Sequence, residues 1–251
     1  MAGKLFGFPI STLDLPALIA RLTAPAEVGG GMQLLVTMNL DHVVKLRRDS
    51  RFRHAYARAA IVTLDGAPGS AFAKVKGLDA PRCPGSDLTA ALAPRLDPLR
   101  HRPFFVLSSL ETVAVVRQKL LNQGFQPDQL GFQSPDPGFE RDAAASQALA
   151  AAIKAHAPTH IFFGLGAPKS EIWLAERQDQ FGDVHALAIG ASLEFWAGTA
   201  KRAPKLMRRI GLEWAWRVAH DPVRLFRRYF IASWAFLPAM LEDLASGRDS
   251  R

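Results

Sequence analysis

The chain has 251 residues, of which 49% are hydrophobic and 22% charged, so it can bury a large core as one domain, or as one domain plus an appendage. Its single cysteine, Cys83, excludes an internal disulfide and any multi-cysteine metal site, which favours a reducing compartment such as the cytosol. No stretch is typical of a signal peptide, and the apolar run 230–241 is shorter than the roughly 20 residues of a bilayer crossing. That run could lie on a membrane without traversing it.

Apolar runs alternate with helix-like stretches along the first 190 or so residues, a pattern typical of a parallel sheet covered by helices. The predicted strands are 33–37, 60–64, 104–107, 129–132, 160–164 and 186–189. The predicted helices are 40–48, 50–59, 87–93, 112–122, 140–155 and 171–180. We expect an α/β fold, a Rossmann-like and mostly parallel sheet sandwiched by helices, with ligands at the carboxyl ends of the strands. The segment 65–84 is expected to be a functional loop around a short irregular element.

The composition changes after Gly198, from mixed to basic and aromatic. Residues 201–230 hold 9 Lys and Arg against 2 acidic residues, a difference of +7, while the whole chain carries 31 − 23 = +8. We therefore predict an α/β core over 1–198 and a basic, helical appendage over 199–251. Such a clustered charge collects phosphates, nucleic acid or acidic lipid head groups; the alternative is a solvated helix face.

Small polar and acidic residues follow the first two predicted strands. Thr37 and Asn39 end one strand and Asp65 ends the next, so the three could converge on one cleft. Asp65 precedes Gly66, which would let a ligand approach closely, and it is a candidate general base. The alternative is a simple Asp-Gly turn.

A second group of candidates surrounds the helix predicted near Asp87. Ser86 or Asp87 can cap this helix, and Arg82 stands just before it. A helix N-terminus with a neighbouring arginine can bind a phosphate or carboxylate. An ordinary capped helix with a surface arginine explains the same residues.

The third group runs from Gly164 to Glu171, where a buried-strand signal enters a Gly-Pro loop before a helix. Strand, glycine loop and helix start together form a phosphate cradle, and Lys169 adds a cation beside it. The segment lacks the complete dinucleotide fingerprint and the NTPase phosphate loop. Nucleotide binding of a less familiar kind therefore stays open.

The chain shows no Asp-x-Asp, His-Glu-x-x-His, Cys-x-x-Cys or Gly-x-Ser-x-Gly motif. A metal-dependent sugar transferase of the usual kind and a zinc or serine hydrolase are therefore not indicated, and we predict no metal and no cofactor. The scattered histidines His42, His54, His160 and His185 are interpreted as core or surface residues rather than ligands.

Taken together, these motifs resemble the WecG/TagA/CpsF glycosyltransferase family over residues 14–229. The matching residues, in order, are Thr37-x-Asn39; Asp65-Gly66; Arg82 with Gly85-x-Asp87-Leu88; Gly164-Leu165-Gly166-x-Pro168-Lys169-x-Glu171-x-Trp173; Ala197-Gly198-Thr199 with Lys201-Arg202-Ala203-Pro204; and Gly211-Leu212-Glu213-Trp214 with Arg217, Pro222, Arg224 and Arg227-Arg228-Tyr229. Any one of these blocks is weak evidence for the resemblance, but the whole set in this order is strong evidence.

The resemblance implies transfer of a sugar from a UDP-sugar to a polyprenyl-diphosphate-linked sugar, with inversion and without a required metal, in surface polysaccharide or exopolysaccharide synthesis. It implies a protein attached peripherally to the inner face of the cytoplasmic membrane, and it leaves self-association open. Asp65 corresponds to the base and Thr37 lies beside it. The implied substrate-binding residues are Asn39, Arg82, Asp87, Gly164, Gly166, Pro168, Lys169, Ser170, Glu171, Arg202, Arg217, Arg224, Arg227 and Arg228. With no metal at the leaving diphosphate, fixed cations and backbone N–H groups must stabilise its charge.

Three departures from the family pattern bear on the donor. Ser170 stands where the family usually has glutamine, Ser108-Ser109 replace a glycine-rich turn, and Glu194 stands where aspartate is more common.

Two other functions would explain parts of the sequence. A nucleic-acid-binding module would use the basic segment but has no recognition motif, and we expect no nucleic-acid partner. A Rossmann oxidoreductase would rest on Gly164-x-Gly166 alone, and Pro168 occupies its phosphate loop.

Overall fold

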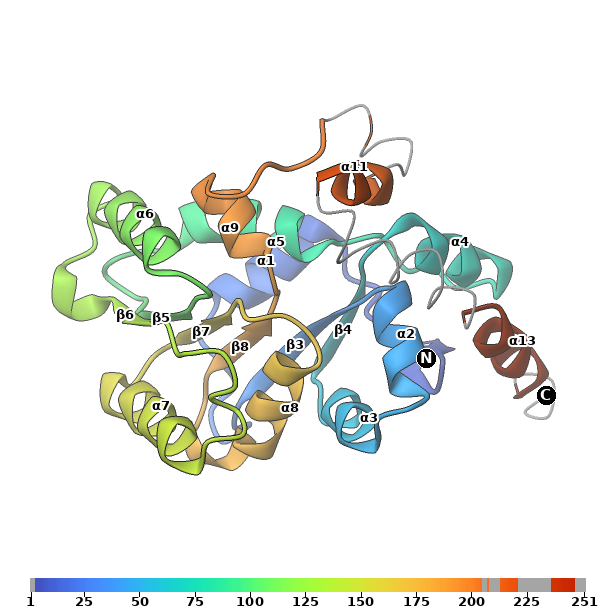
Figure 1. Ribbon diagram of the computed structural model, residues 1–251, viewed down its shortest axis with the longest axis horizontal. Helices are drawn as coiled ribbons and strands as arrows, with labels where there is room; N and C mark the ends of the chain where they lie inside the picture. Colours follow the sequence, from blue (N-terminus) through green and yellow to red (C-terminus); the bar gives the residue numbers. More distant parts are fainter. Residues whose placement is uncertain (1–2, 205–206, 208–212, 221–235, 247–251) are drawn as a thin grey trace.

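A computed structural model describes residues 3–204, 207, 213–220 and 236–246. Its centre is a six-stranded parallel sheet in the order β4-β3-β8-β7-β5-β6 (Figure 1), which confirms the predicted fold class. The strands are β3 (Gln33–Met38), β4 (Ile61–Leu64), β5 (Pro103–Val106), β6 (Gly131–Gln133), β7 (His160–Phe163) and β8 (His185–Ala188). All six strands predicted from the sequence are present, with ends shifted by at most a few residues.

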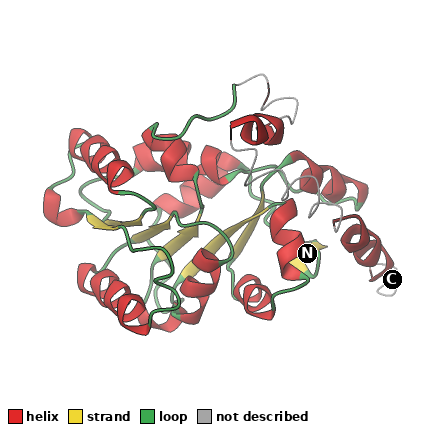
Figure 2. Ribbon diagram, in the orientation of Figure 1, coloured by secondary structure: helices red, strands yellow, loops and turns green. Residues whose placement is uncertain are grey.

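Helices cover both faces of this sheet (Figure 2). They are α1 (Leu15–Thr23), α2 (Leu40–Leu46), α3 (Ser50–Ala57), α4 (Ala67–Val75), α5 (Gly85–Leu92), α6 (Leu110–Asn122), α7 (Ala143–His156), α8 (Lys169–Glu176) and α9 (Ser192–Ala197), with short 3₁₀ turns at Ala93–Arg95, Pro127–Gln129 and Gln178–Gln180. One core cluster joins the sheet to α2, α3, α7 and α8, and a second joins it to α1, α5, α6 and α9. Burial on both faces explains why the strands are continuous apolar runs without polar alternation.

The path of the chain places the ends of β3 and β8 side by side at the middle of the sheet. From β3 the chain moves outward to β4, crosses to β5 and β6, and then returns inward through β7 to β8, which pairs with β3. In an open parallel sheet, ligands bind beyond the carboxyl ends of the strands where the direction of winding reverses. The loops after β3, β4, β7 and β8 all open at that edge.

Two parts of the N-terminal half differ from the sequence prediction. The expected irregular loop over 65–84 contains a regular nine-residue helix, α4. Pro68 lies in its first turn, where the fixed φ of proline suits a helix start and the missing N–H costs no helical bond. The helix predicted at 87–93 begins earlier, at Gly85, so Ser86 and Asp87 lie inside its first turn and do not cap it.

The N-terminus forms a hairpin of β1 (Lys4–Leu5) and β2 (Phe8–Pro9), which the last described helix, α13 (Phe236–Ser246), contacts. The rings of Phe6 and Phe236 are 5.6 Å apart, and the Phe6 N–H donates to Asp243 Oδ1 at 2.9 Å. Lys76 Nζ lies 2.7 Å from Asp243 Oδ2. These contacts join α13 to the N-terminal hairpin and to the end of α4, and α13 also packs against α2 (Figure 1).

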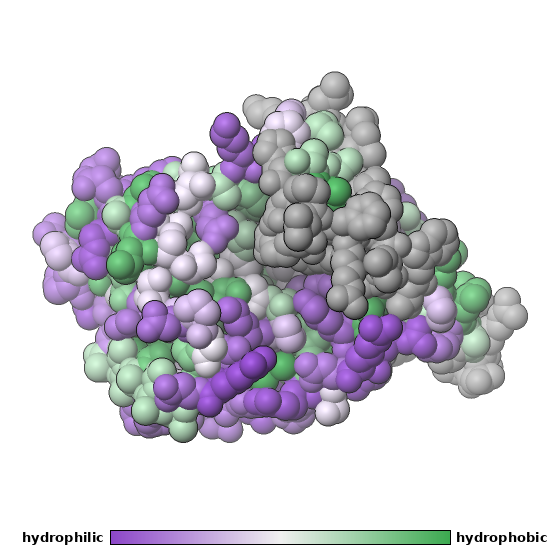
Figure 3. Space-filling model, viewed as in Figure 1, coloured by the Kyte–Doolittle hydropathy of each residue, from purple (hydrophilic) through white to green (hydrophobic). Residues whose placement is uncertain are grey.

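The apolar run 230–241, which could lie on a membrane without traversing it, falls partly in α13. Residues 230–235 lie outside the described residues, whereas Phe236 and Ala239 pack into the core and Leu237 and Leu241 are exposed. Hydrophobic residues are visible around α4 and α13 in Figure 3, while the surface over α2, α3 and α8 is mainly hydrophilic. Among the described residues, no helix combines the length and hydropathy that a membrane crossing requires.

Candidate functional site

The tips of β3 and β4 bring Thr37, Asn39 and Asp65 to the same edge. Thr37 pairs with Thr63 in parallel register, and the Asp65 N–H donates to the Met38 carbonyl at 2.7 Å. Asp65 therefore begins its loop directly beside Met38 and Asn39, half-buried at the end of the sheet. Thr37 is almost fully buried, and the Asn39 side chain accepts from the His42 N–H as the cap of α2.

Arg82 lies close to Asp65 through the backbone. Leu64 and Arg82 form a parallel bridge, and the Cys83 N–H donates to the Leu64 carbonyl at 2.9 Å. The Arg82 side chain is exposed. The strand tip that carries the candidate base therefore has a cation, Arg82, on the adjacent segment.

The start of α5 and the segment after α9 meet through an ion pair. Arg202 Nη2 lies 2.7 Å from Asp87 Oδ1, with side chains 18% and 33% exposed. At Gly85 the fit is close, because an added Cβ would stand 2.8 Å from Ser192 Oγ. Asp87 and Arg202, both expected to bind substrate, therefore form an ion pair with each other where the C-terminal segment begins.

The loop between β7 and α8 is packed against the middle of the sheet. A Cβ at Gly164 would lie 3.2 Å from the Val106 carbonyl, and Gly166 has φ +83°, a conformation that favours glycine. Ser170 donates from both its N–H and its hydroxyl to the Gly166 carbonyl. In the described part of the chain, the N–H groups of Leu165, Gly166 and Ala167 donate no hydrogen bond.

Pro168 and Lys169 complete this loop. Pro168 precedes α8, and Lys169 is its first residue, half-buried at the helix N-terminus. The free N–H groups of a first helical turn carry partial positive charge, to which Lys169 adds a full one. Gly164, Gly166, Pro168 and Lys169 thus lie together on one loop, the carboxyl-end loop of β7.

Glu171 lies in the first turn of α8 but is only 2% exposed. Burial raises its pKa to about 7; its own backbone N–H and the charge of Lys45 oppose this rise, and Asp41 adds to it. Its Oε2 atom has no hydrogen-bond partner among the described residues. Lys45 Nζ lies 2.6 Å from Asp41 Oδ2 and donates to the Ala167 carbonyl at 3.1 Å.

Tyr56 of α3 is buried in the same region. Its hydroxyl lies 2.6 Å from His42 Nδ1, and its pKa is raised by burial and by the charges of Glu171, Asp65 and Asp41. A group of titratable side chains from α2, α3 and α8 therefore lies beneath the loop after β7, next to the Asp65 strand tip. Neither Asp41 nor Lys45 stands out in the sequence, because a charged pair spaced i, i+4 on a helix is typical of a solvated face.

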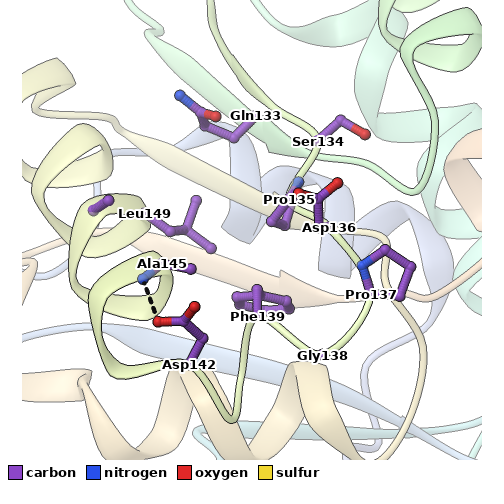
Figure 4. A pocket seen from close by; sticks show the side chains of 11 residues that line it. Gln133, Ser134, Pro135, Asp136, Pro137, Gly138, Phe139, Asp142, Ala145 and Leu149 are labelled. Carbon is purple, nitrogen blue, oxygen red and sulfur yellow. Dashed lines mark hydrogen bonds between the residues drawn. The ribbon is translucent and has the colours of Figure 1, made fainter.

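A cavity of about 400 Å³ opens at the carboxyl end of β6 (Figure 4). Gln133, Ser134 and Asp136 line it with Phe139 and Leu149. The Phe139 ring packs against Phe163 and Trp173, at centroid distances of 6.4 and 6.3 Å, which connects this cavity to β7 and α8. This segment does not stand out in the sequence, because it carries no phosphate or metal motif.

Two of the residues that depart from the family pattern, Ser108 and Glu194, contact each other. Ser108 Oγ hydrogen-bonds to Glu194 Oε1, and Ser109 caps α6 by accepting from the Thr112 N–H. Ser108 and Glu194 thereby join the end of β5 to α9. Ser170, the third departure, is fully buried and bonded within its own loop, as described above.

Three histidines lie at the opposite, amino end of the sheet. His101, His160 and His185 donate from Nε2 to the carbonyls of Thr23, Leu22 and Ala24, respectively, at the end of α1. The His101 and His160 rings meet edge to face with centroids 5.1 Å apart, and the His160 and His185 rings are tilted against each other at 5.3 Å. His42 is also buried and His54 is exposed. No cluster of three His, Cys, Asp or Glu side chains within the described ranges could hold a metal ion.

The remaining candidates are arginines of the C-terminal segment. Arg217 belongs to α11 (Glu213–His220), with its side chain outside the described atoms. Arg224, Arg227 and Arg228 lie outside the described residues. Their predicted contact with substrate diphosphate therefore remains a prediction.

The model of the "Glycosyl transferase WecG/TagA/CpsF family" matches residues 3–250. Similar curated proteins include the "N-acetylglucosaminyldiphosphoundecaprenol N-acetyl-beta-D-mannosaminyltransferase" of Staphylococcus aureus strains MW2 and NCTC 8325, each 27% identical over 77% of this chain and 74% of the relative. The same protein from strain MRSA252 is 26% identical over the same shares. The chain therefore belongs to the WecG/TagA/CpsF family and is a glycosyltransferase.

Proposed function

We propose that this glycosyltransferase moves a sugar from a UDP-sugar onto a polyprenyl-diphosphate-linked sugar, in the synthesis of a surface polysaccharide or exopolysaccharide. The name of the Staphylococcus aureus relatives specifies an N-acetylglucosaminyl diphosphoundecaprenol acceptor, which supports this class of acceptor. The observation that carries the proposal is the meeting of Asp65, Arg82 and the loop after β7 at one edge of the sheet.

The proposed reaction is a single displacement with inversion. The acceptor hydroxyl oxygen forms a bond to the anomeric carbon as the bond from that carbon to the UDP oxygen breaks. Asp65 accepts the hydroxyl proton, and Thr37 lies on the neighbouring strand tip. UDP leaves with the electron pair of the broken bond.

The leaving diphosphate requires positive charge around it. Three N–H groups of the loop 165–167 without acceptors in the described chain, the N-terminus of α8 and Lys169 supply part of it. We assign Arg82, Arg202, Arg217, Arg224, Arg227 and Arg228 to the remainder. Fixed cations make a metal ion unnecessary in this scheme.

The cavity beside β6 would receive the nucleoside end of the donor, since it adjoins β7 through Phe139. Hydrogen exchange with and without UDP tests this placement. UDP should protect the amides of 134–142 and 164–170. Protection confined to other segments would contradict it.

The basic segment suggests where the enzyme works. With +7 of charge over residues 201–230 and the exposed Leu237 and Leu241 of α13, the protein would bind peripherally to the inner face of the cytoplasmic membrane. It should float with anionic vesicles and be released by salt. Equal binding to neutral vesicles would contradict this assignment.

Radiolabelled transfer tests the function directly. The protein is incubated with single UDP-sugars, including UDP-N-acetylmannosamine, and with polyprenyl-diphosphate N-acetylglucosamine, with and without a chelator. One donor should give labelled lipid, and the chelator should not abolish the transfer. Failure of every UDP-sugar would refute the proposal.

A further inference from the structure

We propose that Lys45 is a positioning residue that holds the loop between β7 and α8 in the shape that binds the donor diphosphate. The inference rests on the proposed function, because it assigns this loop to the UDP-sugar. It concerns a residue on a different helix, α2, which no motif marks as functional.

The contacts of Lys45 support this role. Its ammonium donates to the Ala167 carbonyl at 3.1 Å and lies 2.6 Å from Asp41 Oδ2. Lys45 and Asp41 are 32% and 13% exposed, so the pair is partly removed from solvent. A hydrogen bond from a charged donor is stronger than one between neutral groups, and low exposure reduces its competition with water.

The loop itself explains why one contact matters. The Gly166 carbonyl is held by Ser170, whereas the Ala167 carbonyl is held by Lys45 from outside the loop. The Gly166 carbonyl shares its peptide plane with the Ala167 N–H, whereas the Ala167 carbonyl belongs to the peptide that ends at Pro168, which has no N–H. Ser170 therefore fixes the plane before Ala167, and Lys45 fixes the plane after it, which leads into α8. With both planes fixed, Ala167 is held between them, and with it the direction of its N–H and the start of α8, so Lys45 acts on the donor through the backbone.

The buried Glu171, in the first turn of α8, lies within electrostatic range of both Lys45 and Asp41. The contacts of Lys45 itself are with Asp41 on its own helix and with the Ala167 carbonyl of the loop. These two contacts join α2 to the loop that leads into α8.

The test compares Lys45→Met with Lys45→Arg and a matched control. Methionine keeps an unbranched side chain but removes the charge and the hydrogen bond. The control is Arg51→Met, which breaks the exposed Arg51–Glu176 ion pair between α3 and the other end of α8. All variants are examined as full-length protein by transfer kinetics, UDP calorimetry and amide hydrogen exchange.

We expect Lys45→Met to raise the KM for the UDP-sugar about tenfold while kcat changes less than about twofold, because Lys45 contacts no reacting atom. The amides of 164–170 should exchange faster, UDP should bind about tenfold more weakly, and Lys45→Arg should restore most of the loss. Arg51→Met should match the wild type in all of these measurements.

Two results separate this inference from the proposed function. If Lys45→Met matches Arg51→Met in UDP affinity and in loop exchange, the positioning role is refuted, whatever the enzyme transfers. If the wild type transfers no sugar but Lys45→Met still loosens the loop and weakens UDP binding, the positioning role is supported and the proposed reaction is wrong.

Discussion

At the scale of single residues, Glu171 shows how a motif position can differ from its expected setting. The sequence places it among substrate-binding residues, at the start of a helix, where carboxylates are common and usually exposed. The structure buries it beside Lys45 and Asp41, with a pKa of about 7. A buried carboxyl that keeps its proton near neutral pH can donate a hydrogen bond, which an ionised one cannot.

This pKa predicts how Glu171→Gln changes stability with pH. The folded pKa of about 7 exceeds the ordinary value of 4.5, so between these two pH values the native state holds a proton that the unfolded state has lost. Wild-type stability should therefore fall as pH rises through this window, by up to about 1.4 kcal/mol per pH unit, and level off above it. The glutamine variant should lack this slope.

Urea unfolding of both proteins at about pH 5, 6, 7 and 8 measures the difference. The wild type should lose stability relative to the variant between pH 5 and 7. A difference in unfolding free energy that is independent of pH would show that Glu171 ionises normally.

At the scale of elements, three imidazoles hold the end of α1 against the amino end of the sheet. His160 is buried, and burial lowers its pKa to about 3, while its bond to the Leu22 carbonyl partly opposes that fall. Burial also lowers the pKa of His185, and the charges of Arg21 and His101 lower it further. Both rings are therefore neutral in the folded protein at pH 7.

Because the folded pKa of His160 lies below the ordinary 6.5, the unfolded state binds more protons below pH 6.5. Stability should be unaffected by this group above pH 6.5 and should fall as pH drops from there towards 3, by about 1.4 kcal/mol per pH unit at most. His160→Gln should lower stability at pH 7 but reduce the acid slope. The exposed His54 provides the control, and His54→Gln should keep the wild-type slope.

The measurement is the urea midpoint at about pH 7, 6 and 5 for the three proteins. An unchanged acid slope in His160→Gln would mean that other groups cause the acid sensitivity.

The elements that could be predicted from the sequence are those whose burial leaves a clear hydrophobic pattern. Strands buried on both faces are continuous apolar runs such as Ile161-Phe162-Phe163, and their ends identified Asp65 and Gly164. The hairpin β1–β2 was missed because two-residue strands show no periodicity, and α4 because its Gly and Pro residues mark the helix start rather than a loop. The Lys45–Ala167 bond joins residues 122 positions apart, which no local pattern records.

At the scale of the whole molecule, the C-terminal segment does not simply leave the core. Near its start, Arg202 pairs with Asp87 of α5. Its last described helix, α13, contacts the N-terminal hairpin, where Asp243 accepts from the N–H of Phe6, 237 positions earlier in the chain. Truncation after Gly198 would therefore remove both the basic segment and a helix that covers core residues. Point substitutions separate these two effects.

Asp243 is the centre of this return contact, since it accepts from the Phe6 N–H and pairs with Lys76. The Asp243 side chain is only 9% exposed, and its removal leaves the Phe6 N–H and the Lys76 ammonium without this acceptor. Asp243→Ala should therefore lower the free energy of unfolding by about 2 kcal/mol. The neighbouring Glu242 forms an exposed pair with Arg47, and Glu242→Ala should cost less than about 0.5 kcal/mol. Equal losses in denaturant unfolding would contradict a specific role for Asp243.

The central claim is that the carboxylate at the tip of β4 takes the proton of the acceptor hydroxyl. Turnover of a labelled UDP-sugar onto polyprenyl-diphosphate N-acetylglucosamine tests it in Asp65→Asn, with Asp79→Asn as the control because Asp79 is an exposed carboxylate on the same β4–α5 connection. We predict that Asp65→Asn lowers kcat by about a hundredfold or more while Asp79→Asn keeps wild-type turnover. An Asp65→Asn enzyme that retains wild-type kcat would contradict the account.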